Sequence, residues 1–172
     1  MKKIVSKLKH MAIAFAIIAT SHNVAFSQQN VNLSGNWKLN EQKSDFQGQA
    51  ANVVFNQIKI NQTKDSLKIS GLTVGQTDFG KSKTIAYPLN GSKITTTMSN
   101  NRTMDANLTW INNGSSLVRL SSYSLPGLPN TKDYESKETW SLITGDNELI
   151  LVREFTTSDG RSTTVKALYD RQ

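Results

Sequence analysis

Apolar and polar residues alternate along most of the chain after Asp45. An alternation with period two places successive side chains on opposite faces of a β-strand, so the pattern predicts strands rather than helices. Threonine, serine, isoleucine, valine and aromatic residues, which suit strands, dominate the same stretches. We predict ten strands, near residues 34–40, 53–62, 66–74, 82–89, 93–99, 103–112, 115–124, 134–144, 147–157 and 162–170.

Short turn sequences separate these strands, and Asn-Gly and Asp-Gly supply the positive φ angles that tight hairpins need. The segment 41–50 is the one stretch after the first strand that suits a short helix or turn, and we expect 126–129 to be a loop because Pro126 and Pro129 oppose regular pairing. The turns lie at Lys64-Asp65, Asn90-Gly91, Asn113-Gly114, Gly145-Asp146 and Asp159-Gly160.

Each turn also predicts which residues face one another across its hairpin, since antiparallel partners are spaced evenly about the turn. The predicted pairs are Ile60–Ile69, Tyr87–Ile94, Ile85–Thr96, Met104–Tyr123, Leu108–Arg119, Trp110–Leu117, Glu138–Arg153, Trp140–Leu151 and Leu142–Leu149.

About ten antiparallel strands need a way to hide their edges, and closing into a barrel removes the edges altogether. The short loops between sequential strands favour a single antiparallel up-and-down β-barrel of about 8–10 strands over a two-sheet sandwich. An outer-membrane barrel would need a nearly continuous apolar outer band. Residues 93–97 read Lys-Ile-Thr-Thr-Thr, which is too polar for contact with lipid.

The predicted pairing places charged residues on an apolar inner face. Glu138 faces Arg153, and their Cβ atoms lie about 4.5–5.5 Å apart in directly opposed pairs; Arg119 is a second cation on such a face. In one hypothesis Glu138 and Arg153 form a satisfied structural ion pair, since buried charges are tolerated when paired. In the other, an interior arginine binds a ligand carboxylate through its bidentate guanidinium. The candidate ligand-binding residues are Tyr87, Met98, Trp110, Arg119, Trp140 and Arg153.

Residues 1–27 have the three parts of a secretory signal peptide: a basic head, an uncharged run over 11–20 and the small residues of Ala25-Phe26-Ser27. The run is half the length of about 20 residues that spans a bilayer. We therefore predict cleavage before Gln28, one domain over 28–172, no membrane embedding after cleavage, and a periplasmic or secreted location. Without residues 1–27 the chain has 16 Lys and Arg against 13 Asp and Glu, and no basic-aromatic cluster, so we expect no nucleic-acid binding.

The chain lacks the usual means of catalysis. It has no cysteine, and its two histidines, His10 and His22, lie in the predicted signal. We therefore expect no zinc site, no metal, no cofactor and no catalytic residue, and we predict that the protein is not an enzyme. Glu135 and Glu138 point to opposite faces of one strand, which argues against a glycosidase carboxylate pair.

Residues 33–40, Leu-Ser-Gly-Asn-Trp-Lys-Leu-Asn, contain a Gly-x-Trp sequence that resembles the signature of the lipocalins and the wider calycin superfamily. The resemblance implies structural roles for Gly35 and Trp37, with Trp37 closing one end of the barrel against an arginine from a late strand, either Arg153 or Arg171. Residues 33–46 are similar to a group of small exported bacterial lipocalin-like proteins, and the strand count resembles that of the fatty-acid-binding proteins. The second lipocalin motif is matched only loosely by residues 131–134, where a lysine interrupts it.

Together these features predict an exported lipocalin-like barrel that binds a small, partly apolar or fatty-acid-like ligand without covalent chemistry. A structural or protein-interaction barrel with a filled core and no ligand is the alternative. Packing of the interior discriminates between them, because a filled core leaves no pocket.

Overall fold

A computed structural model describes residues 30–98, 100–143 and 145–172. The predicted signal peptide, residues 1–27, lies outside the described residues. In the described part of the chain the strands are β1 (Gly35–Leu39), β2 (Gln57–Gln62), β3 (Ser66–Leu72), β4 (Thr84–Pro88), β5 (Ile94–Thr97), β6 (Thr103–Ile111), β7 (Ser116–Leu125), β8 (Leu128–Ile143), β9 (Glu148–Thr157) and β10 (Ser162–Arg171).

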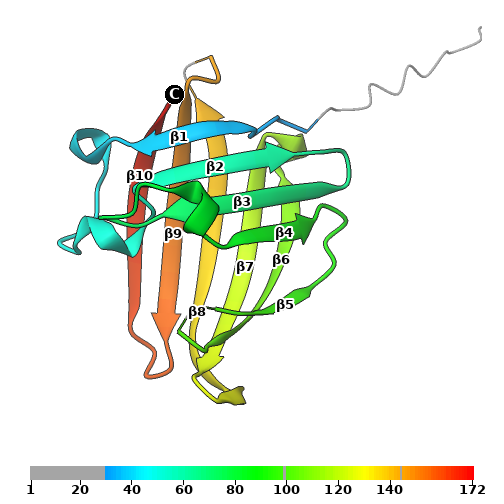
Figure 1. The fold of residues 1–172 in the computed structure, drawn as a ribbon, viewed down its shortest axis with the longest axis vertical. Coiled ribbons are helices and arrows are strands. Elements are labelled where there is room, and N and C mark those ends of the chain that lie inside the picture. The colour runs from blue at the N-terminus through cyan, green and yellow to red at the C-terminus, as the bar shows by residue number, and fades with distance from the viewer. Residues whose placement is uncertain (1–29, 99, 144) are drawn as a thin grey trace, which may run out of the picture.

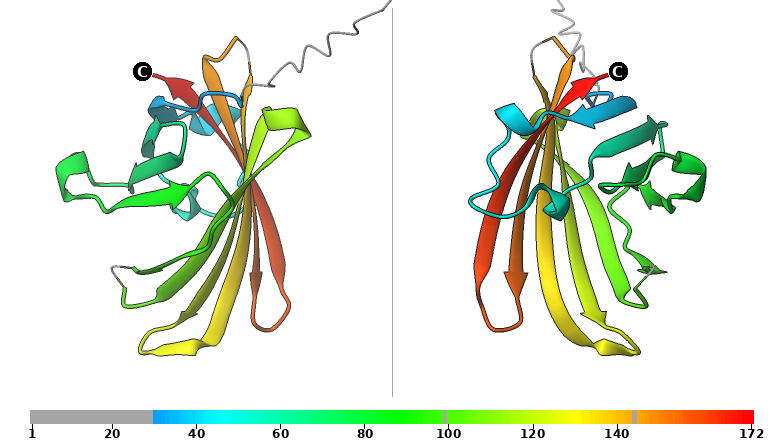
Figure 2. Two further views of the ribbon diagram at one scale, coloured as in Figure 1. Left: turned by 90° about the vertical axis from the view of Figure 1, so that its right-hand side faces the viewer. Right: turned by 60° about the vertical axis from the view of Figure 1, so that its left-hand side comes forward.

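These strands form one antiparallel sheet in the order β4-β3-β2-β1-β10-β9-β8-β7-β6-β5. Neighbours in the sheet are neighbours in the chain except at β1 and β10, which bring the two ends of the chain together. Strands β1–β4 cross over β5–β10 and the sheet curls into a nearly closed up-and-down barrel (Figures 1 and 2). The predicted fold class is therefore confirmed.

The barrel is open between β4 and β5, and here the sequence prediction was wrong. The expected Tyr87–Ile94 and Ile85–Thr96 pairs do not form, because β4 pairs only with β3 and β5 only with β6. Two features of the connection explain this: Pro88 has no N–H to donate to a ladder, and five residues, not two, separate the strands. A side chain spans the opening instead, since Lys83 Nζ donates to Thr96 Oγ1 at 2.9 Å and also to Thr97 O.

The other turn-based registers are confirmed. The turn over residues 145–146 places Glu138 opposite Arg153, and the turn over 113–114 places Leu108 opposite Arg119. Ile60 likewise faces Ile69 across the β2–β3 hairpin. The remaining predicted pairs of these hairpins are also observed.

Two short segments differ from the expected boundaries. A 3-10 helix, η1 (Glu41–Lys43), follows β1 as predicted, but a second one, η2 (Ala51–Val53), occupies the expected start of β2. Residues 126–129 are not wholly a loop: Leu125 pairs with Leu128, so the turn is confined to Pro126 and Gly127 and β8 runs through Pro129. The prolines are tolerated because the register shifts twice beside this turn.

One end of the barrel is closed by Trp37, which is 1% exposed. The guanidinium of Arg171 lies 4.2 Å from the centre of the Trp37 ring and donates to Ser34 O at 2.8 Å. A methyl group on Gly35 would lie 2.8 Å from Arg171 Nη1, so glycine allows this close approach. Of the two arginines that the resemblance left open, Arg171 is the one against Trp37.

The apolar core fills the space between the two halves of the sheet next to this closed end. Strands β1, β2 and β6 bury alternate residues, as the sequence pattern predicts, whereas β7 buries Ser116–Arg119 in succession and no residue of β5 is fully buried. In the described part of the chain no helix has the length and apolar character that crossing a bilayer requires. The largest fully buried side chains are Trp37, Trp140, Tyr87, Tyr169, Leu33, Ile58, Leu67, Leu72, Met104, Leu108, Leu117 and Leu149.

Candidate functional site

A cavity of about 180 Å³ lies inside the barrel, on the side of the core away from Trp37. The pleat directs alternate residues of β3, β4 and β7–β9 into it, and the segment after η2 contributes Phe55. Charged, aromatic and sulfur-containing side chains therefore meet around one partly open cavity. They include Phe55, Tyr87, Met98, Met104, Arg119, Tyr123, Tyr134, Glu138, Trp140 and Arg153.

Arg119 and Glu138 form the central ion pair of this cavity. They face each other across β7 and β8, and Arg119 Nη2 donates to Glu138 Oε1 at 2.5 Å. Both are buried, at 7% and 2% exposed. Arg119 Nη1 donates to the Tyr87 hydroxyl at 2.9 Å, and Trp140 Nε1 donates to Glu138 Oε2 at 3.1 Å. Each charge is thus held in place by a neutral neighbour.

Arg153 is the second cation beside Glu138, which the β8–β9 register predicts. Its Nε lies 3.5 Å from Glu138 Oε1, a looser contact than that of Arg119. Arg153 Nη1 donates instead to Val53 O at 2.5 Å. The sequence prediction of a Glu138–Arg153 pair is confirmed, but Arg119 is the closer partner of the carboxylate.

The interior has more positive than negative charge, because two guanidinium groups share one carboxylate. In the described part of the chain, the Nε atoms of both Arg119 and Arg153 are buried without a hydrogen-bond partner. Buried polar groups are nearly always hydrogen-bonded, so two cationic Nε donors without a hydrogen bond at one cavity are unusual, even though Arg153 Nε keeps its ionic contact with Glu138 at 3.5 Å. Burial is the largest single effect and lowers the pKa of Arg119, but Glu138, Tyr87 and Tyr123 together outweigh it and raise the pKa above its ordinary value, so the charge persists.

Two serine hydroxyls add unused hydrogen-bonding capacity on the same face. Ser121 and Ser136 face each other across β7 and β8, one row from the Arg119–Glu138 pair. Within the described residues, both hydroxyls are buried without a partner. These hydroxyls are unsatisfied polar groups next to the ion pair, but neither serine lines the cavity.

Aromatic rings form the far side of the cavity. Tyr123 and Tyr134 are stacked, with ring centres 4.2 Å apart and planes inclined by 15°. Burial, with a smaller contribution from Tyr123, raises the pKa of Tyr134 to about 12. Tyr134 is therefore neutral at physiological pH and adds no negative charge beside the arginines.

The segment at the end of η2 and just after it lies against the cavity, and two barrel side chains hold it there by hydrogen bonds to its backbone. Arg153 holds Val53 O, and the Tyr169 hydroxyl donates to Phe55 O at 2.9 Å. The Phe55 ring rests on the backbone of Gly71, where an added methyl group would come within 2.4 Å of the ring. This segment therefore has a defined position, fixed by two side chains of the barrel.

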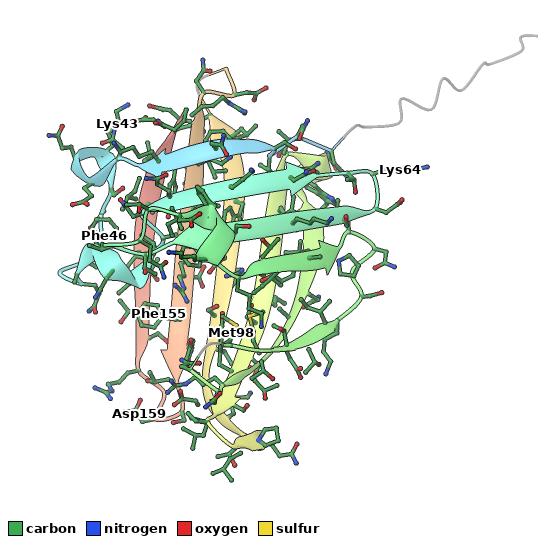
Figure 3. All side chains as sticks on the ribbon, in the orientation of Figure 1. Lys43, Phe46, Lys64, Met98, Phe155 and Asp159 are labelled. Carbon is green, nitrogen blue, oxygen red and sulfur yellow. The ribbon has the colours of Figure 1, made fainter. Side chains whose placement is uncertain are left out.

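Five of the six candidate ligand-binding residues line the cavity: Tyr87, Met98, Arg119, Trp140 and Arg153. Met98, labelled in Figure 3, lies just beyond β5. Their part in binding stays a prediction. Trp110 does not line the cavity; it lies opposite Leu117 near the β6–β7 turn, where it packs against the core.

Sequence reasoning missed the contribution of Val53 and Phe55. The sequence predicts a strand that begins at residue 53, and nothing in the local pattern indicates that Val53 and Phe55 line a cavity. The described residues contain no group of three or more His, Cys, Asp or Glu side chains placed to hold a metal ion.

Comparisons with known proteins bear on the fold. The chain matches no protein-family model and no curated protein sequence. Among solved structures it is similar to zebrafish ileal bile acid-binding protein in complex with cholic acid, with a TM-score of 0.51 and 12% identity over 81% of this chain and 98% of the other. At this identity the likeness concerns the fold alone. The protein therefore shares the nearly closed, ten-stranded up-and-down β-barrel fold of that structure.

Proposed function

We propose that this protein binds a small anionic molecule, without covalent chemistry, in the cavity inside its barrel. The observation that carries the proposal is the pair of arginines, Arg119 and Arg153, that share the Glu138 carboxylate. The buried Nε of each lacks a hydrogen bond, and that of Arg153 has only the 3.5 Å ionic contact with Glu138. A ligand carboxylate would supply the missing acceptor and the missing negative charge. Charge-assisted hydrogen bonds of this kind are about twice as strong as neutral ones.

The size of the cavity restricts the ligand. Pockets for drug-sized molecules measure roughly 300–1,000 Å³, whereas this one measures about 180 Å³. A short, partly apolar acid is compatible with the observed space, and a long fatty acid is not unless the η2 segment moves. The zebrafish bile acid-binding protein supports an interior site only by analogy of fold, since the binding of cholic acid is a property of that protein.

The same small volume favours a second candidate, the filled-core interaction module. In that case Arg119 and Arg153 serve only to neutralise Glu138, and the protein acts through its outer surface. The two functions differ in one measurable property, because only the first gives saturable binding of a small acid that depends on the interior arginines.

The test is a calorimetric titration with hexanoate and with hexan-1-ol, which differ in charge at one end. We expect hexanoate to bind at least about tenfold tighter, a difference of about 1.4 kcal/mol. Arg153→Met should abolish this preference, because it removes one of the two cations beside Glu138. The matched control is Lys137→Met, which removes a positive charge from the outer face, where Lys137 pairs with Glu154. Equal binding of acid and alcohol, or equal effects of the two variants, would contradict the proposal.

We also propose that the protein is exported after cleavage of residues 1–27 and acts in the periplasm or outside the cell. The basic head, short apolar run and small residues before Gln28 support this. The intact mass of the protein recovered from its own cells tests it. We expect a chain that begins at Gln28, and a chain that retains its N-terminal lysines would contradict export by this route.

A further inference from the structure

Aromatic side chains are concentrated at the cavity. They make up 8% of the whole chain but five of the nineteen residues that line this space. They come from four parts of the barrel, since Phe55 follows η2, Tyr87 lies on β4, Tyr123 lies on β7, and Tyr134 and Trp140 lie on β8. A single amphipathic strand could not bring these rings together, because they come from elements that are far apart in the chain.

Each ring is held in position by a contact that does not involve a ligand. Tyr123 and Tyr134 stack on each other, and the Phe55 ring lies on the backbone of Gly71. Hydrogen bonds to charged groups fix Trp140 through its Nε1 and Tyr87 through its hydroxyl. Because these rings are already fixed, ligand binding loses little side-chain conformational entropy at the cavity wall. A preorganised wall of this kind favours a rigid ligand, which also loses little entropy on binding.

The space between these rings is short and carries its positive charge at one side. A volume of about 180 Å³ is too small for a long alkyl chain or a fused multi-ring molecule of drug size. Aromatic rings attract other rings in offset-stacked and edge-to-face arrangements beyond what burial of apolar area provides. The sulfur atoms of Met98 and Met104, which also line the cavity, favour contact with ring edges as well.

We infer that the ligand is a small aromatic carboxylate, with its acid group at Arg119 and Arg153 and its ring against the aromatic wall. This inference rests on the proposed function and adds the class of the ligand. It distinguishes one planar ring from a flexible alkyl chain of the same size and charge.

The experiment compares benzoate with heptanoate, which have equal numbers of non-hydrogen atoms and one carboxylate each, by titration calorimetry on the processed chain. We expect benzoate to bind on the order of tenfold tighter, the size of one or two ring–ring contacts. If heptanoate binds equally well or tighter, the inference is wrong and the proposed anion site stands. If the folded protein binds neither acid, both proposals are overturned.

A pair of variants at Tyr134 tests the wall itself. Tyr134 is only partly buried, so the protein should tolerate substitution there. Tyr134→Phe keeps the ring and should keep the preference for benzoate. Tyr134→Leu removes the ring and should weaken benzoate several-fold while leaving heptanoate unchanged. Equal weakening of both acids by Tyr134→Leu, or loss of the preference in Tyr134→Phe, would overturn the assignment of the ring-binding surface.

Discussion

Replacing Arg119 with methionine removes the closer partner of Glu138 and leaves the carboxylate buried. Methionine fills much of the same volume, so the main change is the loss of charge and of two hydrogen bonds, to Glu138 Oε1 and to the Tyr87 hydroxyl. The substitution therefore isolates the electrostatic role of Arg119 from its packing.

The expected cost follows from how deeply the pair is buried. Glu138 is 2% exposed, and breaking a buried ion pair by removing one partner costs about 3–5 kcal/mol. Arg153, whose Nε lies 3.5 Å from Glu138, and Trp140 Nε1 remain to stabilise the carboxylate. We therefore expect a loss near about 3 kcal/mol, at the lower end of that range.

Urea denaturation of the single variant, of Glu138→Leu and of the double variant measures the free energy of unfolding and the coupling between the two residues. The double variant should be more stable than Arg119→Met, because no unpaired carboxylate remains in the interior. A loss of less than about 1 kcal/mol for Arg119→Met, or a double variant whose loss equals the sum of the two single losses, would refute this reasoning.

Three other predictions concern the aromatic residues and their supports. Gly71→Ala should destabilise by about 1–3 kcal/mol, measured by urea denaturation, because the new methyl group would meet the Phe55 ring at 2.4 Å; an unchanged midpoint would contradict this. Trp37→Ala should cost about 3–5 kcal/mol in the same assay, since a fully buried indole is lost, and a loss under about 1 kcal/mol would show that Trp37 does not support the closed end. Because folding raises the pKa of Tyr134, the neutral side chain stabilises the fold fully below pH 10.0, and this stabilisation is lost as the pH rises toward about 12. The urea midpoint should therefore fall over that window, and it should fall less in Tyr134→Phe.

Local patterns were sufficient to predict the strands and most of the hairpins. Asn113-Gly114 and Gly145-Asp146 close their hairpins where the positive φ angles of Asn113, Gly114, Gly145 and Asp146 are needed. Once a turn is located, period two determines the register, which is how Glu138 and Arg153 were placed on one face.

The closer ion pair was not predictable in the same way, because bulges interrupt the hairpin that carries it. Register shifts lie on both sides of Ser124. Extending the Leu125–Leu128 pairing without them would place Arg119 opposite Tyr134, four residues from its true partner, Glu138. The sequence of the β7–β8 turn does not indicate how many additional residues the bulges place in β8.

The opening between β4 and β5 and the path of the η2 segment depend on tertiary structure. Asn90-Gly91 forms a turn, but the barrel keeps its flanking strands apart and no ladder follows. Val53 and Phe55 reach the cavity because Arg153 and Tyr169, about a hundred residues later in the chain, bind their carbonyl groups. Contacts between residues so far apart in the chain produce no periodic pattern in the local sequence, so they could not be predicted from it.

Native mass spectrometry of the protein, purified gently from its own cells and compared with the denatured mass, tests the central claim of an interior anion site most directly. The account predicts a discrete extra mass that is lost on denaturation, belongs to a small carboxylic acid and is absent from Arg153→Met. A single mass without ligand, unchanged after incubation with benzoate and hexanoate, would contradict it and favour the filled-core module.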